Sequence, residues 1–470
     1  MATTINYNSS NPRVLIIGAG LAGAEAANFL ANRRVPVVLY DLKQCRHTTT
    51  GQQSGLGELI CSNSLKSKEL GSAHGMLKYE MKGLDSLILQ AAEEFSVPAG
   101  GALAVDRHKF SQLITETLCN HPLIELIDGQ EVCDPPACAL KHQCSHVIIA
   151  SGPVTSSKLE SWIGQQAVVK SDNLYFYDSI APVVNAESLN LDQLYYKDRH
   201  LDGSAEREAD YLNIPLNKQE YLELVNDLLA AQKVPLNKFE KPKYFEGCMP
   251  IDLLAERGVD TLRFSCMKPV GLELPSGARP YAVIQLRREN LLGSAYNLVG
   301  FQNRLTHGEQ LKVFRKVKGL QTATFLKLGS VHRNTYINAR ESLDYTMQSN
   351  QIRGLYFAGQ ISGVEGYTES AAMGLYVAHQ LWQRLSKPET LPSQWPCETA
   401  IGALVNYIMT WERPTPSNIN FGLMPPLDVT PVKGKKRWEV KKLKKELISV
   451  RAQQAFDKFI ISSVDQGVTI

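Results

Sequence analysis

Residues 13–41 read RVLIIGAGLAGAEAANFLANRRVPVVLYD, and this stretch decides the fold. Arg13–Ile17 and Val35–Tyr40 are short apolar runs of the kind that form buried parallel strands. Between them, Gly18–Gly23 has the G-x-G-x-x-G spacing and runs into Ala24–Ala31, an alanine-rich segment that favours a helix. The order strand, glycine loop, helix, strand predicts a βαβ unit that binds a dinucleotide through its pyrophosphate.

Three later features extend this unit into a larger nucleotide site. Asp41 ends the second predicted strand, where its carboxylate is placed to accept the hydroxyls of an adenosine ribose. A third predicted strand, His146–Ala150, runs into small residues. A fourth predicted strand, Gly354–Gln360, ends in glycine and carries Gly359 and Gln360. Two separated parts of a chain that close one nucleotide site are typical of FAD-dependent proteins, and an unrelated αβ unit is the alternative.

The composition is that of a soluble globular protein of two or three domains. The chain has 470 residues, 44% hydrophobic and 21% charged, which excludes wholesale disorder. Its most apolar early run, from Val14 to Glu25, is far shorter than the ~20 residues that cross a bilayer. The first residues lack the pattern of a secretory signal, and nine scattered cysteines do not suggest a disulfide framework. We therefore expect a cytoplasmic protein with reduced thiols.

The pattern along the chain predicts a divided domain. The expected fold class is α/β, with a Rossmann-like FAD-binding domain of the glutathione-reductase type split by an α+β insertion domain. The insertion shows strand-like runs at Leu174–Tyr177, Ala282–Leu286 and Asn297–Phe301 and an amphipathic helix near Lys218–Ala231. The predicted boundaries are 12–165 and 331–432 for the two parts of the FAD-binding domain, 166–330 for the insertion and 433–470 for a basic helical tail.

The tail concentrates positive charge. In Lys433–Arg451, nine basic residues stand against two acidic ones, a net charge of +7 that leaves −4 for the rest of a chain with +3 in total. Apolar residues recur there at helical spacing: Val440, Leu443, Leu447 and Val450. We expect the helix to dock by this apolar stripe and to present its lysines outward. Such a segment favours RNA as a partner, and a solvated basic face is the alternative.

Two cysteines lie in settings suited to chemistry. Cys61 lies in the polar turn Glu58–Ser64 after the first βαβ unit, and Cys248 lies in the turn Phe245–Pro250. A catalytic thiol needs access and stabilisation of its thiolate, which turns near helix starts offer. The alternative for each cysteine is the role of a small buried hydrophobic residue.

Other chemistries find little support in the sequence. Potential zinc ligands cluster at Cys133, Cys138, His142, Cys144 and His146. Their spacing matches no closed zinc site, so we expect no metal. The absence of a G-x-S-x-G elbow and of a P-loop lysine motif disfavours a serine hydrolase and a nucleoside triphosphatase.

Many of these segments occur in one order in a known family. The sequence resembles the folate- and FAD-dependent tRNA uracil-5-methyltransferases, relatives of the larger flavoproteins that modify wobble uridines, over nearly its whole length. The segments that carry the resemblance are 14–23, 58–65, 77–87, 97–107, 244–250, 267–272, 296–302, 332–338, 357–370 and 418–423.

The resemblance implies a reaction. Methylenetetrahydrofolate donates a carbon, FAD reduced by NADH or NADPH supplies electrons, and C5 of a uracil in the T-loop of tRNA becomes methylated. The target base has to be flipped out of the folded RNA to reach the flavin. Cys248 is implied as the thiolate that adds to uracil C6, and Cys61 as a second thiol near the flavin, although the two roles are open to exchange.

The resemblance also marks residues for the cofactors. Tyr367 resembles the family's aromatic platform for the folate ring, and a structural tyrosine at a helix start is the alternative. The cofactor-binding residues predicted from the motifs and the resemblance are Gly18, Ala19, Gly20, Leu21, Ala22, Gly23, Asp41, Gly359, Gln360 and Tyr367.

Three other functions share parts of this pattern. A related enzyme acting on ribosomal RNA is indistinguishable at this level. A flavin oxidoreductase of small molecules would keep both FAD-binding parts but would need neither two turn cysteines nor a basic tail. A non-catalytic RNA-binding flavoprotein would keep the fold without depending on thiols.

Overall fold

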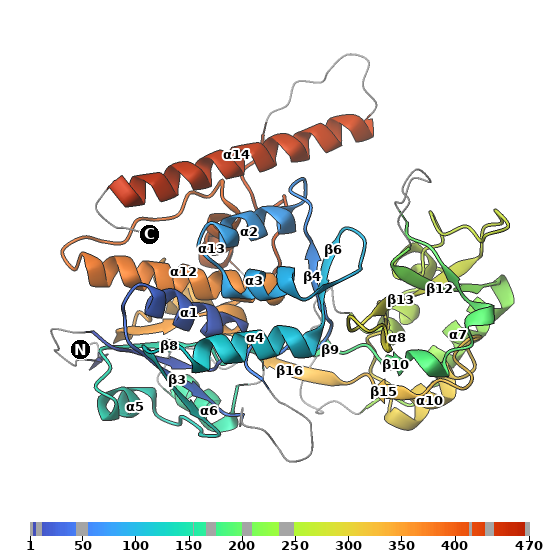
Figure 1. Ribbon diagram of the computed structural model, residues 1–470, viewed down its shortest axis with the longest axis horizontal. Coiled ribbons are helices and arrows are strands. Elements are labelled where there is room, and N and C mark those ends of the chain that lie inside the picture. Colours follow the sequence, from blue (N-terminus) through green and yellow to red (C-terminus); the bar gives the residue numbers. More distant parts are fainter. Residues whose placement is uncertain are drawn as a thin grey trace.

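The computed structural model describes residues 3–5, 12–43, 55–153, 155–165, 175–199, 209–234, 249–412, 416–427 and 437–465, so Cys248 lies outside the described residues. Figure 1 shows a larger lobe, a smaller lobe beside it, and the long helix α14 (Arg437–Asp465) across the larger lobe. Within the described ranges, no helix has the length and apolar character needed to cross a membrane.

A five-stranded parallel sheet forms the centre of the larger lobe, in the strand order β18-β8-β2-β3-β7. These strands are β2 (Val14–Ile17), β3 (Val37–Asp41), β7 (Ile124–Asp128), β8 (His146–Ile149) and β18 (Leu355–Phe357). The central strand β2 is buried throughout, as its continuous apolar run predicts. β18 comes from far along the chain and pairs with β8, so two separated parts of the chain complete one sheet. The predicted FAD-type α/β fold is confirmed.

Helices bring these two parts of the chain together. α1 (Leu21–Asn32) and α12 (Tyr367–Ser386) pack side by side. A Cβ atom on Gly374 of α12 would lie 2.2 Å from the carbonyl oxygen of Ala22, so only glycine permits this approach. The other helices of the lobe are α2 (Ala73–Lys82), α3 (Leu87–Glu94), α4 (Arg107–Cys119), α5 (Pro135–Lys141), α6 (Ser157–Gln165), α11 (Ala339–Ser342) and α13 (Ala400–Thr410).

The smaller lobe is built on an antiparallel six-stranded sheet with its own hydrophobic core. Its strands are β10 (Val183–Asn185), β11 (Tyr195–Tyr196), β12 (Tyr211–Leu216), β13 (Ala282–Arg288), β14 (Ala295–Leu298) and β15 (Phe325–Lys327). Its helices are α7 (Lys218–Ala230), α8 (Ile251–Glu256), α9 (Thr261–Phe264) and α10 (His307–Phe314). The predicted helix near Lys218–Ala231 and strand at Ala282–Leu286 are confirmed.

Short strands link or flank these sheets. β9 (Tyr175–Ser179) pairs with β16 (Val331–Thr335), so the run expected at Leu174–Tyr177 forms a separate two-stranded ribbon and not part of the insertion sheet. The two strands of this ribbon are the segments by which the chain enters and leaves the smaller lobe. The domain boundaries at 166 and 330 stay predictions. The remaining strands are β1 (Thr3–Thr4), β4 (Ser64–Ser67), β5 (Ser96–Val97), β6 (Ala102–Val105) and β17 (Ile352–Arg353).

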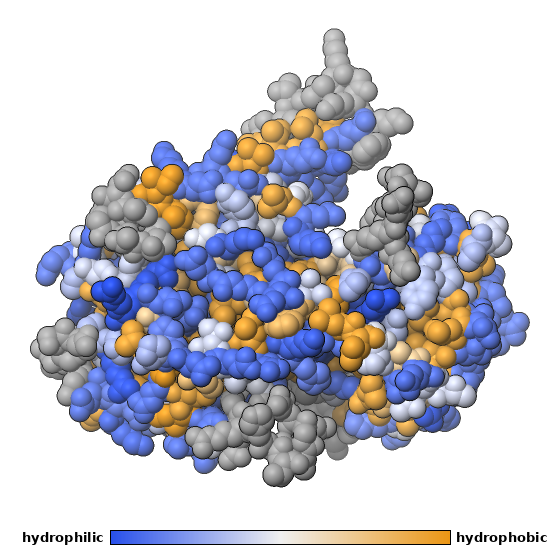
Figure 2. Space-filling model, in the orientation of Figure 1, coloured by the Kyte–Doolittle hydropathy of each residue, from blue (hydrophilic) through white to orange (hydrophobic). Residues whose placement is uncertain are grey.

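The basic helix α14 docks by a different face from the one expected. The α14 residues buried against the larger lobe include Ile448, Ala452, Phe456 and Phe459. Leu447 and Val450, from the predicted docking stripe, are 39% and 48% exposed, and Figure 2 shows apolar patches along this helix. The prediction was wrong because α14 carries apolar residues on two sides, and the side with two phenylalanines buries more apolar surface.

Candidate active site

A cavity of about 500 Å³ opens where β2 runs into the glycine loop, at the carboxyl ends of the central strands. Residues of both lobes line it. From the larger lobe come Gly18, Ala19, Gly20, Leu21, Ala22, Asp41, Cys61, Gln360 and Tyr367, and from the smaller lobe Arg287, Asn297, Val299 and Gln302. Ligands bind at this edge of open α/β sheets because the loops diverge there.

The glycine loop is shaped for close approach of a ligand. Gly18 has φ +101°, and a Cβ atom there would lie 2.4 Å from the oxygen of Ala150. A Cβ atom on Gly20 would meet no protein atom within 4 Å among the described residues, so this glycine faces open space. α1 begins directly afterwards without a side-chain cap, which leaves its first amides able to bind an anion. The loop therefore fits the pyrophosphate of a dinucleotide such as FAD.

The other predicted nucleotide residues divide into two groups. Asp41 lines the cavity while its carboxylate accepts the amide hydrogen of Ala19 at 2.7 Å, so it also holds the loop in place. Gln360 lines the cavity and donates to Glu365 at 2.9 Å. Gly23 and Gly359 are not among the lining residues, and each allows close packing behind the loop.

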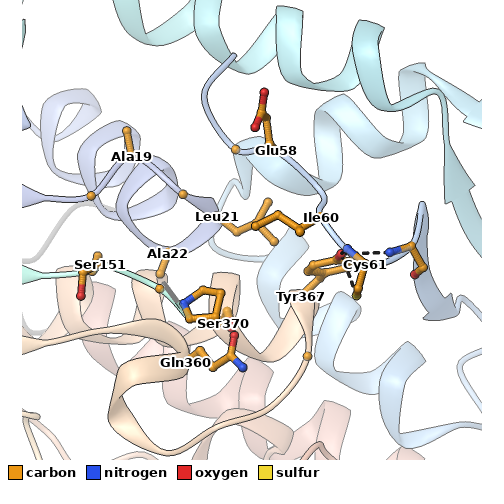
Figure 3. Close-up of a pocket in the computed structure, with 18 of the residues that line it drawn as sticks. Ala19, Leu21, Ala22, Glu58, Ile60, Cys61, Ser151, Gln360, Tyr367 and Ser370 are labelled. Carbon is orange, nitrogen blue, oxygen red and sulfur yellow. Dashed lines mark hydrogen bonds between the residues drawn. The ribbon is translucent and has the colours of Figure 1, made fainter. Parts of the chain in front are cut away.

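Cys61 and Tyr367 meet in the cavity, as Figure 3 shows. The hydroxyl of Tyr367 lies 2.9 Å from Cys61 Sγ. Its oxygen also accepts the amide hydrogens of Cys61 at 2.6 Å and Ser62 at 3.2 Å. Burial, followed by the nearby Cys61 sulfur, raises the pKa of Tyr367 well above its usual range. Tyr367, at the start of α12, is thus hydrogen-bonded to the turn Glu58–Ser64 that carries Cys61, which we call the thiol loop.

Two cations hold the loop that carries Cys61. Arg107, at the start of α4, donates to the carbonyl oxygens of Leu59 at 2.9 Å and Ile60 at 3.1 Å. Lys327, from β15 of the smaller lobe, donates to the same Ile60 oxygen at 2.9 Å, and burial lowers its pKa. Both positive charges lie beside the thiol, where they favour its ionised form.

A buried carboxylate supports the start of α12 from behind. Glu369 is fully buried and accepts the amide hydrogen of Ile419 at 3.1 Å. Burial alone would raise its pKa, but Lys66 at 3.5 Å and His74 at 3.3 Å bring it down to about 2. Lys66 also lines the cavity, so a positive side chain lies near Tyr367.

Two residues of the cysteine and histidine cluster at 133–146, where no metal was expected, have the following surroundings. His142 Nε2 lies 2.8 Å from the hydroxyl of Tyr40, and Cys144 is buried. In the part of the chain that the structure describes, no three His, Cys, Asp or Glu side chains are placed to hold a metal ion together.

Several cavity residues of the larger lobe were predicted from the sequence, whereas those of the smaller lobe were not. The glycine loop, Cys61 and Tyr367 belong to motifs and lie where they were expected. Arg107 and Asn297 fall within the resembling segments 97–107 and 296–302 but were not singled out there as site residues. Lys327 and Arg287 lie outside all of these segments, and sheet register brings them to the thiol loop.

The chain is similar to a family model and to several known proteins. The family model described as Glucose inhibited division protein A matches residues 13–389. A methylenetetrahydrofolate–tRNA-(uracil-5-)-methyltransferase TrmFO of Natranaerobius thermophilus is 46% identical over 451 residues, which cover 95% of this chain and 99% of that protein. The TrmFO of Geotalea uraniireducens is 49% identical over 418 residues, which cover 88% of this chain and 93% of that protein.

A solved structure agrees with the fold. The structure of GidA from Aquifex aeolicus matches with a TM-score of 0.64 at 14% identity, covering 95% of this chain and 74% of that one. The sequence relatives match along nearly the whole chain, which includes the glycine loop, the thiol loop and the start of α12. The chain therefore belongs to the TrmFO family of methylenetetrahydrofolate–tRNA-(uracil-5-)-methyltransferases.

Proposed function

We propose that this protein methylates C5 of a uridine in the T-loop of tRNA, with methylenetetrahydrofolate as carbon donor and FAD as cofactor. The observation that carries the proposal is the pairing of Cys61 with Tyr367 in a cavity that begins at the glycine loop. A flavin oxidoreductase of small molecules would need no thiol loop there. Membership of the TrmFO family supports the same reaction.

The cavity supports FAD as its resident group. The residues proposed to hold it are Gly18, Ala19, Gly20, Leu21, Ala22, Asp41 and Gln360, with Gly23 and Gly359 packing behind them. The chemistry that FAD supplies when bound is the two-electron reduction of the methylene carbon to a methyl group. NADH or NADPH is the proposed source of these electrons.

The proposed reaction requires a thiol because of the low reactivity of the uracil ring. Uracil C5 is a poor nucleophile until a thiolate adds to C6 and pushes electron density towards C5. We assign this addition to Cys248, which is outside the described residues, and proton removal from C5 to the Cys61 side of the cavity. Ile251, three residues after Cys248, donates its amide hydrogen to the oxygen of Gln302 at 2.6 Å, and Gln302 lines the cavity.

A methylation assay with two thiol variants tests the proposal. Purified protein with FAD, NADPH and methylenetetrahydrofolate is given a T-loop hairpin, and mass spectrometry measures 5-methyluridine. Cys61→Ala and Cys248→Ala should each abolish product and keep the flavin, whereas Cys133→Ala, at an exposed thiol, should be silent. Normal activity in either thiol variant would contradict the assigned chemistry.

The RNA substrate is tested separately. RNA from cells that lack the protein should lose the 5-methyluridine of the tRNA T-loop, and the purified protein should restore it. Loss from ribosomal RNA instead would favour the related rRNA enzyme. Loss from neither RNA would favour an oxidoreductase of small molecules.

A further inference from the structure

A row of hydrogen-bond donors crosses the sheet of the smaller lobe and faces the thiol loop. In the sheet register, Arg287 of β13 lies opposite Asn297 of β14, Asn297 lies opposite Val183 of β10, and Val183 lies opposite Lys327 of β15. Residues directly opposite one another on neighbouring strands share one face of a sheet. Three of the four members therefore present nitrogen donors on the same side.

Both outer members of the row are bonded to the thiol loop. Lys327 donates to the oxygen of Ile60 at 2.9 Å. Arg287 donates from Nε to Oδ1 of Asn63 at 3.0 Å, and Asn63 in turn donates to the oxygen of Arg288 at 2.8 Å. The row is thereby fixed in position against the loop that carries Cys61.

Asn297 lies between these two residues, and its side-chain amide nitrogen lacks a hydrogen-bond partner among the residues that the structure describes. The residue is 2% exposed and lines the cavity. A buried amide without a partner costs on the order of 1–3 kcal/mol, so such a group in a cavity points to a ligand. Arg287 also lines the cavity at 7% exposure, and it can only donate.

We propose that Asn297 and Arg287 form the pocket that reads the target base, an inference that rests on the proposed uracil methylation. The amide of Asn297 can donate to O4 and accept from N3–H of uracil, which matches one edge of that base. An asparagine alone does not distinguish uracil from cytosine, because a rotation of its side-chain amide by about 180° exchanges the donor and the acceptor and matches the cytosine edge. The guanidinium of Arg287 can only donate, so it interacts favourably with the O4 carbonyl of uracil and unfavourably with the amino group that cytosine carries at the same position. Arg287 therefore selects uracil.

The same arrangement assists the reaction. When a thiolate adds to C6, negative charge develops on O4 before C5 attacks the carbon donor. Fixed donors in a cavity shielded from water stabilise such a charge more in the transition state than in the ground state. Arg287 and Asn297 are then specificity-determining residues that also lower the barrier.

Variants of Asn297 test the proposal in the FAD-loaded enzyme, with two T-loop hairpins that carry uridine or cytidine at the target position. For Asn297→Ala, we expect kcat/KM for the uridine hairpin to fall by about 10- to 100-fold, while the KM for methylenetetrahydrofolate and the flavin content stay unchanged. Asn297→Asp cannot donate, so it should shift the ratio of binding affinities from the uridine towards the cytidine hairpin. Tyr296→Phe is the matched control, because Tyr296 precedes Asn297 on β14 and its side chain lies on the other face, near Tyr196.

Each outcome separates the possibilities. A wild-type enzyme that does not methylate the uridine hairpin would contradict the proposed function before any variant is compared. An active wild type with an equally active Asn297→Ala variant would overturn the base pocket alone. A rise in the KM for methylenetetrahydrofolate with unchanged hairpin binding would also overturn it and assign these donors to the pterin ring. Loss of flavin only in the Asn297 variants would show a structural role instead.

Discussion

The hydroxyl oxygen of Tyr367 has three hydrogen-bond partners, and two of them can only donate. These two are the backbone amides of Cys61 and Ser62. Because the pKa of Tyr367 is raised by burial, its phenol keeps a hydrogen at neutral pH. The remaining direction for that hydrogen is Cys61 Sγ at 2.9 Å, so the tyrosine donates to the sulfur. A sulfur that accepts a hydrogen bond is stabilised as a thiolate.

Replacement of Tyr367 by phenylalanine should therefore make Cys61 harder to ionise. A hydrogen bond to a charged group is worth about 1.5–3 kcal/mol, so the pH midpoint of Cys61 alkylation should rise by about one to two units. Peptide-resolved mass spectrometry after brief iodoacetamide treatment measures this rate in the flavin-loaded protein. Tyr376→Phe is the control on the same helix, since its hydroxyl donates to the oxygen of Tyr345 and does not touch Cys61.

Infrared spectroscopy decides the same question without a reagent that has to reach the thiol. The difference between wild type and Cys61→Ser isolates the S–H stretching band of this one residue. In the Tyr367→Phe background, that band should persist to higher pH than in the wild type. An unchanged titration in both measurements would leave Tyr367 with a purely structural or folate-stacking role.

Gly20 offers a test of the nucleotide site at the level of one side chain. A valine there would meet no described protein atom near its Cβ, so the fold should tolerate it, but the side chain would fill space in front of the loop. We expect Gly20→Val to be folded and colourless, whereas the wild type shows the absorbance of oxidised flavin. Gly164→Val is the control, because Gly164, near the end of α6, also has open space around it but does not line the cavity. Normal flavin content in Gly20→Val would contradict the assigned loop.

At the scale of elements, α12 and α14 meet at a buried histidine. His379 of α12 lies among the rings of Phe29, Trp395 and Phe459, with centroids 5.5–6.1 Å away. Neither of its ring nitrogens has a hydrogen-bond partner in the described part of the chain. Burial, followed by the positive charge of Arg33, lowers its pKa from 6.5 to about 3. The neutral ring is therefore a condition for the docking of α14.

The histidine predicts a loss of stability in acid. Between pH 6.5 and about 3 the unfolded chain binds a proton at His379 that the folded chain does not, so the free energy of unfolding falls as the pH falls through this window. Urea denaturation at about pH 7 and about pH 4 measures the loss. His379→Phe should lose less stability over this interval than the wild type. An equal loss in both proteins would assign the acid sensitivity to other groups.

The exposed lysines of α14 belong to the same scale, and their role in RNA binding stays a prediction. Lys441, Lys442 and Lys445 are exposed and Lys444 is half-buried, so the face they form is open to a polyanion. Replacing these four by glutamine should reduce the slope of log affinity against log salt by about one unit per lost phosphate contact. Lys312 of α10 and Lys316 just after it, whose side chains are 68% and 57% exposed, provide the control pair. Equal slopes would identify the lysine face as a solvated surface.

For the whole molecule, the sequence was sufficient where the signal is local. The glycine loop predicts β2, α1 and β3 because each is fixed by adjacent residues, and the amphipathic pattern predicts α7 for the same reason. The docking face of α14 was predicted wrongly, because both of its apolar sides satisfy the same periodicity and only the partner surface selects one. Asn297 lies in the resembling segment 296–302 but was not singled out as a site residue, and its meeting with Arg287, ten residues earlier, depends on the register of β13 and β14.

The two lobes meet at the thiol loop, and one ion pair there spans both. Arg107 of the larger lobe contacts Glu289 of the smaller lobe at 2.7 Å, with side chains only 17% and 7% exposed. The same arginine holds the oxygens of Leu59 and Ile60 beside Cys61. The position of the smaller lobe, including Asn297, is thereby coupled to the position of the thiol.

Breaking this pair from one side should cost more than removing both partners. Arg107→Ala leaves the carboxylate of Glu289 buried without its cation, a situation that costs about 3–5 kcal/mol, whereas the double variant with Glu289→Ala removes that unpaired charge. We expect calorimetry of Arg107→Ala to show the smaller lobe melting below the rest, and the double variant to recover part of the loss. Glu273→Ala, which breaks the more exposed pair with Lys197 inside the smaller lobe, should shift stability far less. If the single and double variants melted alike in one transition, the lobes would be held together by other contacts, such as those of Asn63 with Arg287 and of Lys327 with Ile60, and these would carry the coupling between base pocket and thiol.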